Sequence, residues 1–203
     1  MPKVYAIDGL TPVVDPSAFV HPSAVLIGDV IVGARAYIGP CACLRGDFGR
    51  IVVEAGANVQ DACLLHGFPG KDTVVGAEAT VGHGAVLHGC VVRRGALVGM
   101  NCVVNDNAEV GEDAMVAALA FVRAEACIPA RSLAAGIPAR VLRTLTDEEV
   151  RWKDDNMRLY QKLGERSRAS LREVEALTQA EPNRRRLEIP GSLPLSELKK
   201  RHG

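Results

Sequence analysis

The chain has 203 residues, and its 24 lysines and arginines balance its 24 aspartates and glutamates, so the formal net charge is zero. This length gives room for one domain with a tail, and the lack of a basic surplus disfavours a nucleic-acid-binding protein. Apolar residues make up 48% of the chain but aromatic residues only 4%, which indicates a core of small and β-branched side chains.

Neither export nor membrane insertion is expected. The N-terminus, MPKVYAIDGL, lacks the apolar stretch of a signal peptide, and no run of about 20 apolar residues occurs. The six cysteines form no Cys-x-x-Cys pair, and disulfides are rare in a reducing cytosol. We therefore expect a cytoplasmic protein that acts on a small molecule and binds neither nucleic acid nor membranes.

An apolar residue recurs at every sixth position between Val20 and Ile128. The spacing slips three times, and 18 six-residue units result, each headed by Val, Leu or Ile. A small residue, mostly Ala, follows four positions after most heads. Gly often comes directly after the head, as Gly33 and Gly39 do, and we expect these glycines to provide the backbone conformation of a corner.

One large and one small inward residue in every six describe a flat strand that ends at a corner, and three such strands close a triangular coil. Eighteen units make six coils, about 29 Å tall at the usual strand spacing. The repeat resembles that of the hexapeptide-repeat family, and this resemblance implies a left-handed parallel β-helix. We expect an all-β domain over residues 1–145, with an N-terminal lead-in, and an α-helical C-terminal segment with a tail over residues 146–203.

The C-terminal segment is predicted to contain two helical stretches. Thr146 and Glu149 fit a capping box, which predicts a helix over about residues 147–163 that is broken by Gly164. A second, polar helical stretch is expected over about residues 165–179. The mixed charges of this segment indicate a helix that lies against the β-helix or against a neighbouring subunit.

Three of the five histidines fall together in the repeat. His66 and His88 each follow a head by one residue, and their heads are three units apart, so the two imidazoles stack on successive coils about 5 Å apart. Two imidazoles at that spacing can share one zinc ion. His83 belongs to the preceding face, so we expect it to come from a neighbouring copy in a cyclic homotrimer with shared sites.

Further polar residues fall into the same columns of the repeat. Arg45 lies one coil below His66, and Gln60 lies one coil below the unit that carries His83. Asp61 is expected directly beneath His83, where its carboxylate can accept a hydrogen bond from the ring and fix its tautomer. The sequence therefore predicts a polar cleft around the three histidines.

The runs LRGDFGRIVV, NVQDACLLHG, VGHGAVLHGC and ALVGMN resemble the γ-class carbonic anhydrases, a family of hexapeptide-repeat enzymes, over roughly residues 10–145. The resemblance implies that zinc, or a similar divalent ion, is held by His66, His83 and His88 from two subunits of a trimer. It also implies that Arg45 and Asp47 pair across the subunit interface. Gln60 matches the residue that positions the zinc-bound water or the substrate.

The N-terminal VYAIDGLTPVV, the loop HGFPGKDTVVG and the C-terminus are similar, more narrowly, to the phenylacetate-degradation branch of that family and to its carnitine-operon relatives. This similarity implies a zinc-dependent thioesterase that hydrolyses acyl-CoA thioesters of the ring-hydroxylated phenylacetyl type. Prototypical γ-class enzymes carry glutamates that shuttle protons. Here Phe48 follows Asp47, and the loop over residues 67–74 contains no Glu, so thioester hydrolysis is favoured over fast CO2 hydration.

Three alternatives stay open. The same zinc site could hydrate CO2 to bicarbonate. Hexapeptide-repeat proteins also include acyltransferases, which use a histidine as general base and need no metal, and a role in carnitine metabolism belongs with this alternative. The third alternative is a non-catalytic assembly subunit with a vestigial site.

Overall fold

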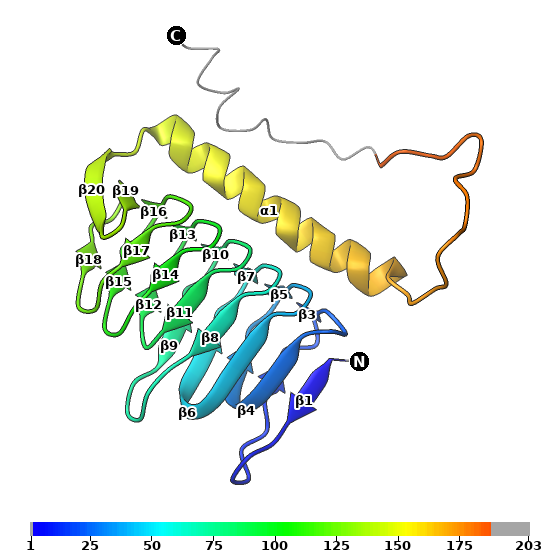
Figure 1. Cartoon of the computed structure of the whole chain (residues 1–203), viewed down its shortest axis with the longest axis horizontal. Coiled ribbons are helices and arrows are strands. Elements are labelled where there is room, and N and C mark those ends of the chain that lie inside the picture. The colour runs from blue at the N-terminus through cyan, green and yellow to red at the C-terminus, as the bar shows by residue number, and fades with distance from the viewer. Residues whose placement is uncertain (1, 188–203) are drawn as a thin grey trace.

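The computed structural model describes residues 2–187, and residue 1 and residues 188–203 lie outside this description. The repeat units fold into a left-handed parallel β-helix that is followed by one α-helix, α1 (Asp147–Ser170), as Figure 1 shows. No helix among residues 2–187 combines the length and the apolar character that crossing a membrane requires. The predicted tail falls largely in the part of the chain that is not described.

The β-helix has three faces. The first, which we call the histidine face, is built from the first halves of β4 (Val25–Val32) and β6 (Cys43–Val53) with β8 (Leu64–His66), β11 (Val86–His88), β14 (Val103–Val104) and β17 (Phe121–Val122). The second face holds β2 (Val13–Val14), the second halves of β4 and β6, β9 (Thr73–Val75), β12 (Val91–Val92), β15 (Glu109–Val110) and β18 (Cys127–Ile128). β1 (Lys3–Tyr5) pairs with the start of β4.

The third face, which we call the helix face, lies under α1. It stacks β3 (Phe19–Val20), β5 (Tyr37–Ile38), β7 (Asn58–Val59), β10 (Thr80–Val81), β13 (Leu97–Val98), β16 (Met115–Val116) and β19 (Ser132–Gly136), all parallel. β20 (Ala139–Thr144) turns back antiparallel to β19 and covers the last edge of the sheet.

The structure has about seven turns rather than the predicted six, because β1 and β2 precede the first recognised unit and β19 continues the stack beyond the last one. The residue that heads this extra strand is Ala134, which is fully buried but too small to match the Val, Leu or Ile pattern.

The interior of the coils is filled as the spacing predicted. Heads such as Leu65 and Leu87 are fully buried, and small partners such as Ala85 and Cys102 lie beside them. Because the three sheets enclose a narrow triangular space, one large and one small side chain per strand fill it without aromatic rings.

The corners differ from the expectation. Left-handed backbone occurs three residues after the head, as at Asn101 (φ 55°) and Asp113 (φ 55°), not at the glycine that follows the head. That glycine has another cause: a Cβ at Gly99 would lie 2.5 Å from the backbone nitrogen of Ala118 on the next coil. The prediction that these glycines provide the corner conformation is therefore wrong, and they are needed because stacked coils approach closely.

Helix α1 begins at the predicted capping box, in which the Thr146 side chain accepts from the Glu149 amide and the Glu149 carboxylate accepts from the Thr146 amide. The helix then continues through Gly164 to Ser170, so the predicted break is wrong. Of the second helical stretch predicted over residues 165–179, only residues 165–170 are helical, as the end of α1. Gly164 is buried, and a Cβ at this position would lie 3.4 Å from the Cβ of Phe19. The missing side chain lets the helix lie close to the helix face.

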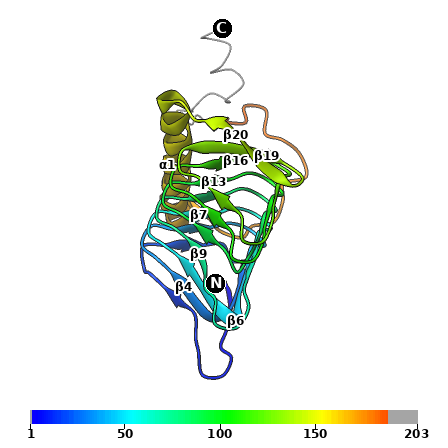
Figure 2. The same cartoon turned by 90° about the vertical axis from the view of Figure 1, so that its left-hand side faces the viewer.

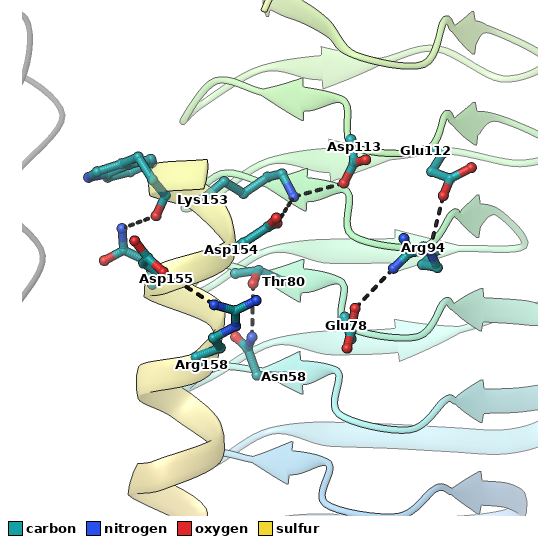
Figure 3. Close-up of polar contacts among 12 residues, drawn as sticks. Asn58, Glu78, Thr80, Arg94, Glu112, Asp113, Lys153, Asp154, Asp155 and Arg158 are labelled. Carbon is teal, nitrogen blue, oxygen red and sulfur yellow. Dashed lines mark hydrogen bonds and ion pairs between the residues drawn. The ribbon is translucent and has the colours of Figure 1, made fainter. Parts of the chain in front are cut away.

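Figure 2 shows α1 lying along the helix face beside β7, β13 and β16. Lys153 is only 1% exposed, and its Nζ lies 3.0 Å from Asp113 Oδ1 and 2.6 Å from Asp154 Oδ1 (Figure 3). Nearby, Trp152 packs on a small apolar cluster centred on Met115. The helix is thus fixed by one buried ion cluster and by apolar packing.

Replacing Gly164 by Ala is expected to raise the free energy of unfolding by up to about 1 kcal/mol, because Ala is the better helix former. Its Cβ would meet Phe19 at an ordinary contact distance. Gly164→Leu should lower stability, since the larger side chain would push α1 away from the sheet. Urea unfolding followed by circular dichroism measures both, and a destabilised Ala variant would contradict the continuous helix.

Candidate functional site

The two stacked histidines are where the repeat predicts them. His66 on β8 and His88 on β11 pair in register on neighbouring coils, and their ring centroids are 5.2 Å apart. Both strands end at the corner between the histidine face and the second face, so the two imidazoles lie at one edge of the β-helix.

The polar partners of His66 come from β6, one coil below. Arg45 Nη2 lies 2.8 Å and Asp47 Oδ1 lies 3.0 Å from the same ring nitrogen, His66 Nε2. One ring nitrogen cannot accept from a guanidinium and donate to a carboxylate at the same time, so the two groups compete for it. Arg45 Nε is buried and has no hydrogen-bond partner within residues 2–187. The pairing of Arg45 and Asp47 across a subunit interface stays a prediction.

His88 has a carboxylate partner that sequence reasoning missed. Its Nδ1 is hydrogen-bonded to Asp106, which lies two residues after the next head of the histidine face. Asp106 and His88 stand at different steps of the repeat, so the rule that placed Asp61 beneath His83 does not find this contact. The ring of Phe68 stacks on His88 at 6.2 Å, and that of Phe48 lies 5.4 Å from His66, so two aromatic rings flank the imidazole pair.

The loop between β8 and β9 is tied to both histidine strands by Thr73. This buried hydroxyl donates to the carbonyl of His66 at 2.6 Å and accepts from the amide of Gly89 at 2.9 Å. The carbonyl belongs to His66, and Gly89 directly follows His88, so Thr73 holds the ends of β8 and β11 together.

His83 lies after β10, at the opposite edge of the histidine face. Its Nδ1 is 3.1 Å from Asp61 Oδ2, the neighbour that the repeat predicted. On its other side, the hydroxyl of Tyr160 from α1 lies 3.3 Å from His83 Nε2. Burial raises the pKa of Tyr160 to about 12, so the hydroxyl remains a donor at neutral pH. Sequence reasoning missed Tyr160 because the repeat does not say where α1 packs.

Gln60 is buried beneath His83 at the end of a short hydrogen-bonded chain. Its Oε1 accepts from the backbone amide of His83 at 3.3 Å, and its Nε2 donates to Asn58 Oδ1 at 3.1 Å. Asn58 in turn donates to the hydroxyl of Thr80 at 2.8 Å (Figure 3). These bonds fix the amide and the histidine turn, whereas a role of Gln60 toward water or substrate stays a prediction.

Within residues 2–187 of one chain, no three His, Cys, Asp or Glu side chains gather closely enough to hold a metal ion. The expectation that His83 reaches the other two histidines from a neighbouring copy therefore stays a prediction.

The donor set fits zinc in one respect, since each imidazole has a carboxylate at one ring nitrogen, the arrangement that orients metal-binding histidines. His83 and His88 use Nδ1 for this contact, which leaves Nε2 of His88 for a ligand. Nε2 of His83 is hydrogen-bonded to the Tyr160 hydroxyl, which would have to turn away before that nitrogen could bind an ion. On His66 the engaged atom is Nε2, so Arg45 and Asp47 would turn away before that nitrogen could bind an ion.

No family model matches the chain. It is 59% identical over 183 residues to the carnitine operon protein CaiE of Salmonella typhimurium, covering 90% of this chain and 92% of that protein. Among solved structures, a putative acetyltransferase of Bacillus cereus superposes with a TM-score of 0.82 at 33% identity. A hexapeptide transferase family protein from Anaplasma phagocytophilum gives 0.78 at 36% identity. Each superposition covers 83% of this chain and 98% of the other.

Proposed function

Because the chain belongs to the CaiE family of hexapeptide-repeat proteins, which is acyltransferase-like, we propose that it is an enzyme of acyl-group chemistry that hydrolyses CoA thioesters with the help of zinc. The observation that carries the proposal is the stacked pair of His66 and His88, 5.2 Å apart and each in contact with a carboxylate. A structural histidine needs no such duplicate on the next coil. The resemblance to the phenylacetate-degradation branch suggests a ring-hydroxylated phenylacetyl thioester as substrate.

We place the complete site between the subunits of a homotrimer. His83 and the stacked pair lie at opposite edges of the histidine face, before and after β11. The outward residues of that face form an apolar column, and two of them remain 39% and 36% exposed at Leu64 and Val103. If three such faces turned toward a threefold axis, the column would be covered and the edge with His66 and His88 would meet His83 of the next copy. The column consists of Leu64, Val86, Val103 and Phe121.

In this proposal His66, His83 and His88 would hold the ion, which would supply Lewis acidity and activate water at neutral pH. Asp61 and Asp106 fix the tautomers of two of the rings. The protonated hydroxyl of Tyr160 can donate to the thioester carbonyl oxygen.

During hydrolysis the oxygen of water bonds to the acyl carbon and the bond from that carbon to the CoA sulfur breaks. One hydrogen of the water ends on the sulfur, so the products are the carboxylic acid and the free thiol. Phe48 and Phe68 flank the histidine pair.

Acyl transfer is the second candidate, and the transferase names of the two solved relatives favour it over hydrolysis. A transferase would use one histidine as general base toward an acceptor amine or hydroxyl. His88, whose Nδ1 is fixed by Asp106, has the arrangement that such a base requires.

The deciding experiment measures the metal content of the purified protein and the release of thiol from CoA thioesters, with and without an added acceptor. Hydrolysis predicts release without an acceptor, loss of release to background after chelation, and recovery with zinc. Release that requires an acceptor and survives chelation would assign acyl transfer instead. A parallel pH-drop assay with CO2 shows whether the same ion hydrates CO2, and activity with CO2 alone would reject the thioester proposal.

A further inference from the structure

A cavity of about 460 Å³ lies between α1 and the helix face and begins at His83. It extends across the strands from β10 to β19, which is about 14 Å along the stack at the usual strand spacing. Ligand pockets commonly have volumes of about 300 to 1,000 Å³, and a dry cavity of roughly 150 Å³ already accepts benzene. The space therefore suits an organic group larger than one ring.

The walls of the cavity divide it into a polar end and an apolar remainder. Gln60, Thr80, His83 and Tyr160 lie together at the end next to the candidate site. Beyond them, the lining comes from apolar side chains of the sheet and from one indole on α1. These apolar lining residues include Leu97, Met100, Met115, Leu133 and Trp152.

The polar groups at the His83 end are already oriented by hydrogen bonds, whereas the side chains of the sheet strands that line the rest of the cavity are apolar. Gln60 and Tyr160 both hydrogen-bond to His83, and the amide of Asn156 is turned back to donate to the carbonyl of Trp152. A molecule that fits therefore carries a polar group at the His83 end and a mainly apolar body behind it. Methionine side chains on two strands let such a wall adapt to shape.

We propose that this cavity binds the apolar acyl part of the substrate, so that the enzyme selects acyl groups of about six carbons or more over acetyl. The inference rests on the proposed function, because it places the carbonyl carbon at His83 and Tyr160 and directs the acyl tail toward Leu133. Each methylene that leaves water strengthens binding several-fold, so hexanoyl should be preferred over acetyl by at least about 10-fold.

The chain provides its own probe, since Trp152 is its single tryptophan. Tryptophan fluorescence of the intact protein is titrated with hexanoate and with acetate, a measurement that requires neither metal nor turnover. The proposal predicts a saturable change with hexanoate at a concentration at least about 10-fold below that needed for acetate. Equal responses to the two acids, or no response to hexanoate, would overturn it.

Leu97→Phe narrows the cavity. Val91→Phe introduces the same side chain on the preceding strand but on another face, where it serves as the control. Hexanoate binding should weaken at least about 5-fold in the first variant and stay unchanged in the second. Equal effects of the two changes would contradict the proposal, and the titration of the unmodified protein decides if Leu97→Phe does not fold.

The proposed function and the cavity assignment can fail separately. Hexanoate binding without any thioester cleavage would reject the hydrolase proposal and keep the binding site. Cleavage with equal kcat/KM for acetyl and hexanoyl thioesters would keep the hydrolase and reject the site.

Discussion

A refolded equimolar mixture of His66→Ala and His83→Ala chains is expected to recover activity that neither variant has alone. In a trimer with shared sites, a functional interface needs His66 from one chain and His83 from its neighbour. Each position is filled correctly half of the time under random mixing, so about one quarter of the wild-type sites should return. The measurement is the rate of thiol release per chain, before and after mixing.

The matched control is a mixture of His66→Ala and His88→Ala chains. These two residues stack within one chain, 5.2 Å apart between ring centroids, so no interface in a mixed trimer can contain an intact pair. Recovery of activity in the control mixture, or no recovery in the first mixture, would contradict the shared site.

Removing both carboxylates that surround Lys153, in the double variant Asp113→Ala with Asp154→Ala, is expected to cost about 3 to 5 kcal/mol of unfolding free energy. The lysine is 1% exposed and would be left as a buried charge without its two ion-pair partners. Lys153→Met should cost less than about 1.5 kcal/mol, because it keeps much of the volume and removes the charge. Urea unfolding measures both effects.

An exposed ion cluster nearby supplies the control (Figure 3). Arg94 is also paired with two carboxylates, Glu78 and Glu112, each at 3.0 Å, but its side chain is 59% exposed. Since solvent screens such pairs, Glu78→Ala with Glu112→Ala should cost less than about 1 kcal/mol. Equal losses in the two double variants would show that burial of Lys153 does not determine the effect.

The sequence predicted those parts of the molecule that depend on the six-residue period. The inward heads, the stacking of His66 on His88 and the contact of Asp61 with His83 follow from counting along the repeat, because strand stacking converts sequence separation into position. The left-handed sense could not be obtained in this way and came from the family resemblance.

The differences arise where tertiary contacts override a local rule. Gly164 is a poor helix former, yet α1 continues through it to Ser170, because packing of the helix beside Phe19 and Tyr37 outweighs the low helix propensity of one residue. Tyr160 reaches His83 from a helix whose position no repeat encodes. Strand β19 was missed because Ala134 fills a position that the pattern reserves for larger residues.

The placement of α1 has a consequence for how the molecule unfolds. In a stack of coils each layer contacts only the layers next to it, so separate parts can open independently, as in a one-dimensional array. Here helix α1 contacts early coils at β3 and β5, and its Arg168 donates a hydrogen bond to the Ser17 carbonyl. Near its other end, Lys153 binds Asp113 on a late coil. Fraying at one end must therefore disturb contacts at the other, which couples distant layers into one cooperative unit.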